Sequence, residues 1–294
     1  MTAAAGAQAD APDLRGATRL RVRVRGGLSV SVLTWGRAGS RTPLLCLPGL
    51  VRTGGDFTTL AERHAARRLI VSMDYPGRGE SDRALLWRRY LPERTLKDVL
   101  DVCSALSLGR VVAVGTSLGA VLAMGLATVR PRLVSAALLN DAGPVFHQAG
   151  LGFVRAFVGH DHPQPSLEAA IDFLRRSLPW LSLRTDSEWR EMALLSFRRG
   201  ADGIWRANWD TRIARVLDRP MRGDLWDLFA PLGRIPALLV RGGESDVLSA
   251  EIAAEMRRRF PGLNYAELPG VGHAPTLSEP GLAGTVDEFL EAQP

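Results

Sequence analysis

The chain reads Val114-Gly115-Thr116-Ser117-Leu118-Gly119-Ala120 at the point where an apolar run gives way to an Ala/Leu-rich one. This segment predicts a strand that turns sharply into a helix. Small residues on both sides of the serine would let the strand and helix approach closely while the hydroxyl is held out of the turn, as at a nucleophile elbow. An ordinary glycine-bounded turn is the alternative, and the rest of the chain decides between the two.

Strands and helices are expected to alternate along most of the sequence. Short apolar runs without polar alternation, typical of strands covered on both faces, occupy residues 44–47, 69–73, 111–114, 133–139 and 237–240. Helical patterns occupy residues 56–66, 95–106, 118–129, 250–260 and 281–290. This rhythm predicts an α/β fold with a mostly parallel central sheet and helices on both faces.

Three segments depart from that rhythm. Residues 20–34 alternate apolar with polar side chains across Gly26-Gly27, which predicts an N-terminal antiparallel hairpin with one wet face. Residues 144–231 contain no apolar run that resembles a buried strand but hold five of the seven tryptophans, which favours a helical cap inserted before the last strands. We therefore expect a flexible N-terminal tail over 1–17, a core over 18–143 and 232–294, and a cap or lid over 144–231.

Composition and charge indicate a soluble protein. Hydrophobic residues make up 46% and charged residues 23% of the 294, and the formal net charge is +6. Lys97 is the only lysine, and the arginines form no pattern interleaved with aromatic residues, so we expect no nucleic-acid partner. No apolar stretch reaches about 18 residues, and Cys46 and Cys103 show no disulfide spacing, so we expect no membrane partner and a cytoplasmic location.

A serine hydroxyl needs a base to take its proton and an acid to orient that base. Of the five histidines only His273 lies in a loop after a strand-like run, within Leu268-Pro269-Gly270-Val271-Gly272-His273. Asp246 follows the run at 237–240 and gives the chain order Ser117, Asp246, His273. Asp246 is the favoured acid, while Glu244 and Asp141 remain alternatives because both also follow strand ends.

An oxyanion needs two preorganised donors, and backbone N–H groups of a glycine-containing loop can supply them. The N–H of Leu118, directly after the serine, is one candidate. Leu50, in Leu47-Pro48-Gly49-Leu50, is the other.

Two further motifs point to no cofactor or metal. His160-Asp161-His162 has no third ligand at a recognisable spacing, so we interpret it as a solvated lid loop. Gly77-Arg78-Gly79 lacks the pattern of a phosphate-binding loop.

Four segments, in their order and spacing along the chain, resemble the α/β-hydrolase superfamily: residues 74–82, 115–119, 241–246 and 272–275. The resemblance runs from about Leu20 to Leu290. It implies Ser117 as nucleophile, His273 as base, Asp246 as orienting acid, and Leu50 and Leu118 as oxyanion-hole donors. Many members have His-Gly where this chain has Pro48-Gly49.

The residue types narrow the reaction that the resemblance implies. A serine nucleophile differs from the aspartate of the superfamily's dehalogenases and epoxide hydrolases, and the cap region lacks the lysine of its hydroxynitrile lyases. Ala274 follows His273, where C–C bond hydrolases of ring-fission products usually have tryptophan. The expected activity is a carboxylesterase, a serine hydrolase that cleaves an ester of a small, apolar or aromatic substrate through an acyl-enzyme. Lactonase and C–C hydrolase activities are alternatives, and a non-catalytic ligand-binding protein of this fold is an alternative of another class.

Overall fold

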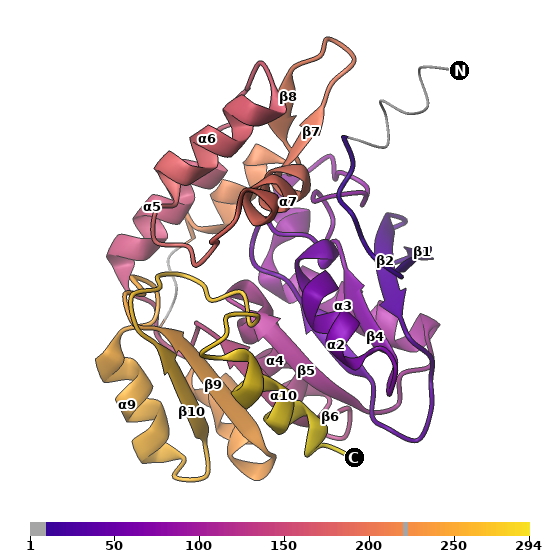
Figure 1. Ribbon diagram of the computed structural model, residues 1–294. Helices are drawn as coiled ribbons and strands as arrows, with labels where there is room; N and C mark the ends of the chain where they lie inside the picture. Colours follow the sequence, from indigo (N-terminus) through magenta and orange to yellow (C-terminus); the bar gives the residue numbers. More distant parts are fainter. Residues whose placement is uncertain (1–9, 220–222) are drawn as a thin grey trace.

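The computed structural model describes residues 10–219 and 223–294 of the chain. An eight-stranded sheet runs through its centre, in the spatial order β1-β2-β4-β3-β5-β6-β9-β10 (Figure 1). The strands are β1 (Thr18–Arg23), β2 (Ser29–Trp35), β3 (Leu44–Leu47), β4 (Ile70–Met73), β5 (Val111–Thr116), β6 (Val134–Asn140), β9 (Ala237–Gly242) and β10 (Asn264–Leu268).

Strand directions agree with the sequence expectation. β1 and β2 form the antiparallel hairpin, and β2 is also antiparallel to β4. The remaining pairs, from β4 through β3, β5, β6 and β9 to β10, are all parallel. Because the carboxyl ends of parallel strands share one edge of the sheet, the loops after β3, β5, β6, β9 and β10 meet there.

Both faces of the sheet are covered, which explains the apolar runs without alternation. Val111 and Ala113 of β5 belong to a core cluster on one face, together with α3 (Pro92–Ala105), α4 (Leu118–Val129) and α9 (Ala250–Arg259). Val112 and Val114 belong to the cluster on the other face, with α2 (Thr58–His64) and α10 (Ala283–Glu291). A parallel strand buried on both sides needs apolar residues at every position.

The chain between β6 and β9 forms the expected cap, gathered over one edge of the sheet (Figure 1). Its elements are α5 (Gln148–Val158), α6 (Leu167–Ser177), α7 (Asp186–Ser196), β7 (Phe197–Arg199), β8 (Trp205–Ala207), η3 (Thr211–Val216), α8 (Trp226–Phe229) and η4 (Ala230–Arg234). The expectation of a segment without strands is wrong at β7 and β8, which pair as an antiparallel hairpin. Three residues are too few for a period-two pattern to stand out from its surroundings.

The cap has a core of its own. Trp189 and Trp205 are buried there with residues of α6 and α7, including Leu174 and Ala193. In contrast, Phe229 of α8 is fully buried in the sheet's main core, so the end of this segment packs on the α/β part of the chain.

Residues 1–9 of the expected N-terminal tail lie outside the described residues. Residues 10–17 differ from the expectation of a frayed tail because they contact the folded chain. Trp35 donates its indole N–H to the carbonyl of Arg15 at 3.1 Å, and Asp10 pairs with Arg199 at 3.0 Å. Within the two described ranges, no helix has both the length and the apolar character needed to cross a bilayer.

Candidate active site

Ser117 occupies a sharp turn between β5 and α4, as the opening segment predicts. Its backbone has φ 54° and ψ −115°, in a region that residues with a side chain rarely adopt. A Cβ atom at Gly119 would lie 1.8 Å from the carbonyl oxygen of Leu47, and one at Gly115 would lie 2.3 Å from Gly119. Glycine is therefore required at both positions for β3, β5 and α4 to approach each other around the serine.

His273, in the loop after β10, lies within hydrogen-bond distance of Ser117. Its Nε2 is 2.9 Å from Ser117 Oγ, and its Nδ1 is 2.8 Å from Asp141 Oδ2. Because a carboxylate can only accept, Nδ1 carries the hydrogen and Nε2 of the neutral ring is left to accept from the serine hydroxyl. The side chain of His273 is only 15% exposed.

The acid that contacts His273 is Asp141, so the prediction of Asp246 for this position is wrong. Asp141 directly follows β6, the strand beside β5, and its side chain is fully buried. Its backbone N–H donates to the carbonyl of Val240 at 2.8 Å, and its Oδ1 accepts from the N–H of Gly242 at 3.1 Å. The carboxylate is thus fixed by the end of β9 as well as by the histidine.

Asp246 lies four residues beyond the end of β9 and is exposed. The start of this loop is tied to the end of β10, because Gly243 N–H donates to Leu268 O and Glu244 N–H donates to Val271 O. Asp246 borders the cavity in front of Ser117, whereas the carboxylate bonded to the imidazole is that of Asp141, and Glu244 is exposed as well. The signal for Asp141 was its place directly after a fully buried strand.

The two expected oxyanion donors flank Ser117. Leu118 is the first residue of α4, so its N–H has no acceptor within the helix. Leu50 follows β3 and lines the same cavity as Ser117, and a Cβ at the neighbouring Gly49 would lie 3.8 Å from Ser117 Cβ. Both residues therefore lie beside the serine, and the catalytic role of their N–H groups stays a prediction.

A cavity of about 410 Å³ lies between the sheet edge and the cap, in front of Ser117 and His273. Its lining is largely apolar and includes Phe153, Phe157, Leu178, Trp180, Met192 and Trp209. Such a lining is typical of a site for a small organic ligand.

Arg52 also lines this cavity, and its charge is already paired. Its Nε and Nη2 donate to the two oxygens of Asp56 at 2.7 and 2.6 Å, and its Nη1 donates to Ser196 Oγ at 2.6 Å. Sequence reasoning missed this pair, because an arginine and an aspartate four positions apart form no motif that marks a cavity wall.

His160 and His162 lie in the cap and not at the cavity. Each ring bonds to a backbone carbonyl of α5, His160 Nδ1 to Ala156 at 2.8 Å and His162 Nε2 to Phe157 at 2.9 Å. These contacts orient the two rings by local helix-end bonding.

Known proteins resemble this chain over most of its length. Residues 44–283 match the model of the alpha/beta hydrolase family. A 3-hydroxybutyrate-oligomer hydrolase of Cupriavidus necator is 30% identical over 266 residues, which cover 87% of this chain and 90% of the relative. An esterase of Mycobacterium tuberculosis is 29% identical over 264 residues, covering 84% of this chain and 82% of the esterase.

A solved structure gives the same result. An alpha/beta hydrolase from Novosphingobium aromaticivorans superposes with a TM-score of 0.88 at 34% identity, covering 94% of this chain and 98% of the other. The family model, the relatives and the solved structure agree with one another and with the turn at Ser117. The chain therefore belongs to the alpha/beta hydrolase family.

Proposed function

We propose that this protein is a serine carboxylesterase that cleaves esters of small, apolar or aromatic substrates through an acyl-enzyme. The observation that carries the proposal is the unbroken hydrogen-bonded series from Ser117 Oγ through His273 to the buried Asp141 carboxylate. Membership in a family whose relatives include an esterase and an oligoester hydrolase supports it.

In the proposed mechanism, His273 Nε2 takes the proton of Ser117 as Oγ attacks the ester carbonyl carbon. The carbonyl oxygen becomes an oxyanion that accepts from the N–H groups of Leu50 and Leu118. Asp141 keeps the proton of His273 on Nδ1 and stabilises the imidazolium.

The tetrahedral intermediate then collapses. The bond to the alkoxy oxygen breaks, and the leaving alcohol takes the proton from Nε2, which leaves an ester of Ser117. A water molecule, deprotonated by His273, attacks the carbonyl carbon of this acyl-enzyme and forms a second oxyanion. The bond between the acyl carbon and Ser117 Oγ then breaks, Oγ takes the proton back from Nε2, and the carboxylic acid leaves.

The cavity supports the proposed substrate class. A volume of about 410 Å³ with an apolar wall suits a small acyl or alcohol group. Arg52, already neutralised by Asp56, offers no unpaired charge to a substrate. The similarity to a hydrolase of 3-hydroxybutyrate oligomers, which are esters of a small hydroxy acid, favours short acyl groups and keeps lactones as a second candidate.

A substrate panel tests the proposal. We expect wild-type protein to hydrolyse p-nitrophenyl acetate and butyrate, and Ser117→Ala to lose that activity while keeping its melting temperature. Turnover of lactones alone would shift the proposal to lactonase, and turnover of a ring-fission product alone would overturn the esterase assignment. Absence of turnover together with tight, Ser117-independent binding of small ligands would favour the non-catalytic alternative.

The proposed location is the cytoplasm. Cys46 and Cys103 are both buried and unpaired, which suits a reducing compartment.

A further inference from the structure

Arg78 is buried beside the loop that carries Leu50, with 1% of its surface exposed. Its Nε donates to the carbonyl oxygen of Leu50 at 2.7 Å, and its Nη1 donates to that of Pro76, also at 2.7 Å. Its guanidinium carbon lies 5.7 and 5.6 Å from the ring centres of Tyr75 and Tyr90. In the described part of the chain, Nη2 has no hydrogen-bond partner, and the carboxylates of Asp210 and Asp98 act on Arg78 through charge attraction and not through a hydrogen bond.

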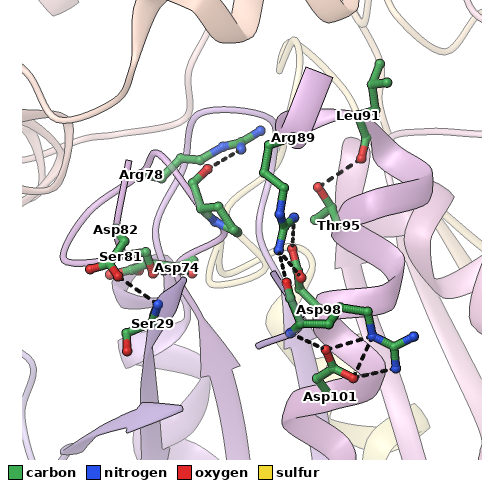
Figure 2. Close-up of polar contacts among 12 residues, drawn as sticks. Ser29, Asp74, Arg78, Ser81, Asp82, Arg89, Leu91, Thr95, Asp98 and Asp101 are labelled. Carbon is green, nitrogen blue, oxygen red and sulfur yellow. Dashed lines mark hydrogen bonds and ion pairs between the residues drawn. The ribbon is translucent and has the colours of Figure 1, made fainter. Parts of the chain in front are cut away.

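A buried cation without a carboxylate in direct contact is costly, because its desolvation is offset only by carbonyl dipoles, ring faces and the more distant charges of Asp210 and Asp98. Burial lowers the pKa of Arg78 to about 10, so the group keeps its charge at neutral pH. Arg89 shows how a charge of this kind is usually stabilised: it makes two hydrogen bonds to the carboxylate of Asp98, at 2.7 and 2.6 Å (Figure 2). The unusual environment of Arg78 therefore calls for a reason beyond stability.

The contacts around Leu50 supply one. All three carbonyls of the turn Pro48-Gly49-Leu50 are bonded: Pro48 O accepts from Tyr75 OH at 3.2 Å, Gly49 O from Arg52 N–H at 3.2 Å, and Leu50 O from Arg78 Nε. Two of these three donors come from the loop after β4. These outside donors therefore help to hold the shape of the turn.

The same loop is joined to the cap. Gly79 N–H donates to Asn208 O at 2.9 Å and Asp210 N–H donates to Gly77 O at 2.8 Å, on either side of Trp209, which lines the cavity. Arg78 thus lies where three parts of the structure meet: the turn Pro48-Gly49-Leu50, the loop after β4 and the cap.

We propose that Arg78 is a positioning residue for ester hydrolysis: its guanidinium holds the Leu50 carbonyl, which fixes the Leu50–Val51 peptide and through it the adjoining Gly49–Leu50 peptide that carries the Leu50 N–H, and its charge stabilises the oxyanion from behind the turn. The proposal rests on the proposed esterase function.

The test compares Arg78→Met with Arg68→Met. Arg68 is a matched control, since it is also 1% exposed and also bonds to carbonyls, those of Thr42, Leu290 and Gln293, but lies before β4 at the opposite edge of the sheet. Both variants lose a buried guanidinium and its carbonyl bonds. A purely structural role predicts similar effects on melting temperature and on kinetics.

The readouts are kcat and KM for p-nitrophenyl butyrate, and inhibition by an alkyl trifluoromethyl ketone and the matching methyl ketone. The trifluoromethyl ketone adds the serine oxygen to its carbonyl and forms a tetrahedral oxyanion, whereas the methyl ketone reports ground-state binding. For Arg78→Met we expect kcat to fall about 10- to 100-fold, somewhat less than for loss of a direct donor, with KM changed less than about 3-fold. Binding of the trifluoromethyl ketone should weaken by a similar factor, and that of the methyl ketone should not.

Arg78→Lys keeps the charge without the Nε bond and should fall between wild type and Arg78→Met. If Arg78→Met does not fold, the same kinetic and inhibition measurements on Arg78→Lys test the role of Arg78. Tyr75→Phe, which removes the donor to Pro48 O, then tests whether the turn depends on its outside donors. The proposal is overturned if the Arg78 variants lose no more kcat and trifluoromethyl ketone affinity than Arg68→Met does. Because that comparison uses an active wild-type enzyme, it is distinct from a failure of the esterase proposal, in which wild type itself shows no Ser117-dependent turnover.

Discussion

Replacing Asp141 by asparagine should strongly lower kcat while the protein still folds. The Asp141 carboxylate accepts from His273 Nδ1 at 2.8 Å and from Gly242 N–H at 3.1 Å, one bond to each oxygen. An amide has one oxygen, so it can satisfy only one of these donors. If the oxygen faces Gly242, the NH₂ group faces His273 and forces the ring hydrogen onto Nε2, where it opposes the Ser117 hydroxyl.

The expected loss in kcat is about 10³- to 10⁴-fold, the size seen when a catalytic histidine is held in the wrong tautomer. This corresponds to about 4 to 5.5 kcal/mol of activation free energy. If the amide turns the other way, its NH₂ group meets the Gly242 N–H and a buried donor is left unsatisfied, which costs about 1 to 3 kcal/mol of stability. Steady-state hydrolysis of p-nitrophenyl butyrate and thermal unfolding measure the two effects.

Asp246→Asn is the matched control, because it makes the same chemical change at an exposed carboxylate beside the same cavity. We expect its kcat to stay within about 3-fold of wild type, as for most surface substitutions away from the reacting groups. The reasoning is refuted if Asp246→Asn abolishes turnover while Asp141→Asn retains most of it.

Three further predictions follow from packing and burial. Gly119→Ala should lose nearly all activity and several kcal/mol of stability by chemical denaturation, because its Cβ would lie 1.8 Å from Leu47 O; wild-type kinetics would contradict the elbow geometry. Arg89→Met should lower the free energy of unfolding by about 3 to 5 kcal/mol, since it leaves the fully buried Asp98 unpaired, and a urea titration measures this. Burial lowers the pKa of His64, so the unfolded chain binds a proton more readily than the folded one, and stability is lost as the pH falls through the unfolded pKa near 6.5. His64→Gln should therefore reduce the fall in melting temperature between pH 7 and pH 5.5. The same fall in the variant as in wild type would count against this prediction.

The parts of the fold that follow from one-dimensional patterns were predictable. The helix at 118–129 and the strand at 44–47 have the bounds that their apolar runs indicate. Ser117 and His273 also follow from local chemistry, since a glycine-bounded strand end and a glycine-rich loop limit where each can lie.

The choice of acid depends on where strands lie side by side, which local sequence does not show. Asp141 and Asp246 both follow strand ends and both lie between Ser117 and His273 in the chain, so the order Ser, Asp, His does not separate them. In the folded sheet, β6 is next to β5 and β9 comes one strand further, so the residue directly after β6 reaches the histidine. The contacts of Arg78 were hidden for the same reason, because Leu50 and Arg78 are 28 positions apart in sequence.

Labelling by a fluorophosphonate probe tests the central claim most directly, because the probe phosphonylates a serine only when a base activates it. After incubation of the folded protein, digestion and peptide mass spectrometry locate the modified residue. The proposed mechanism predicts stoichiometric labelling of Ser117, abolished in Ser117→Ala and strongly slowed in Asp141→Asn. Folded wild-type protein that stays unlabelled, or carries the label on another serine, would contradict it.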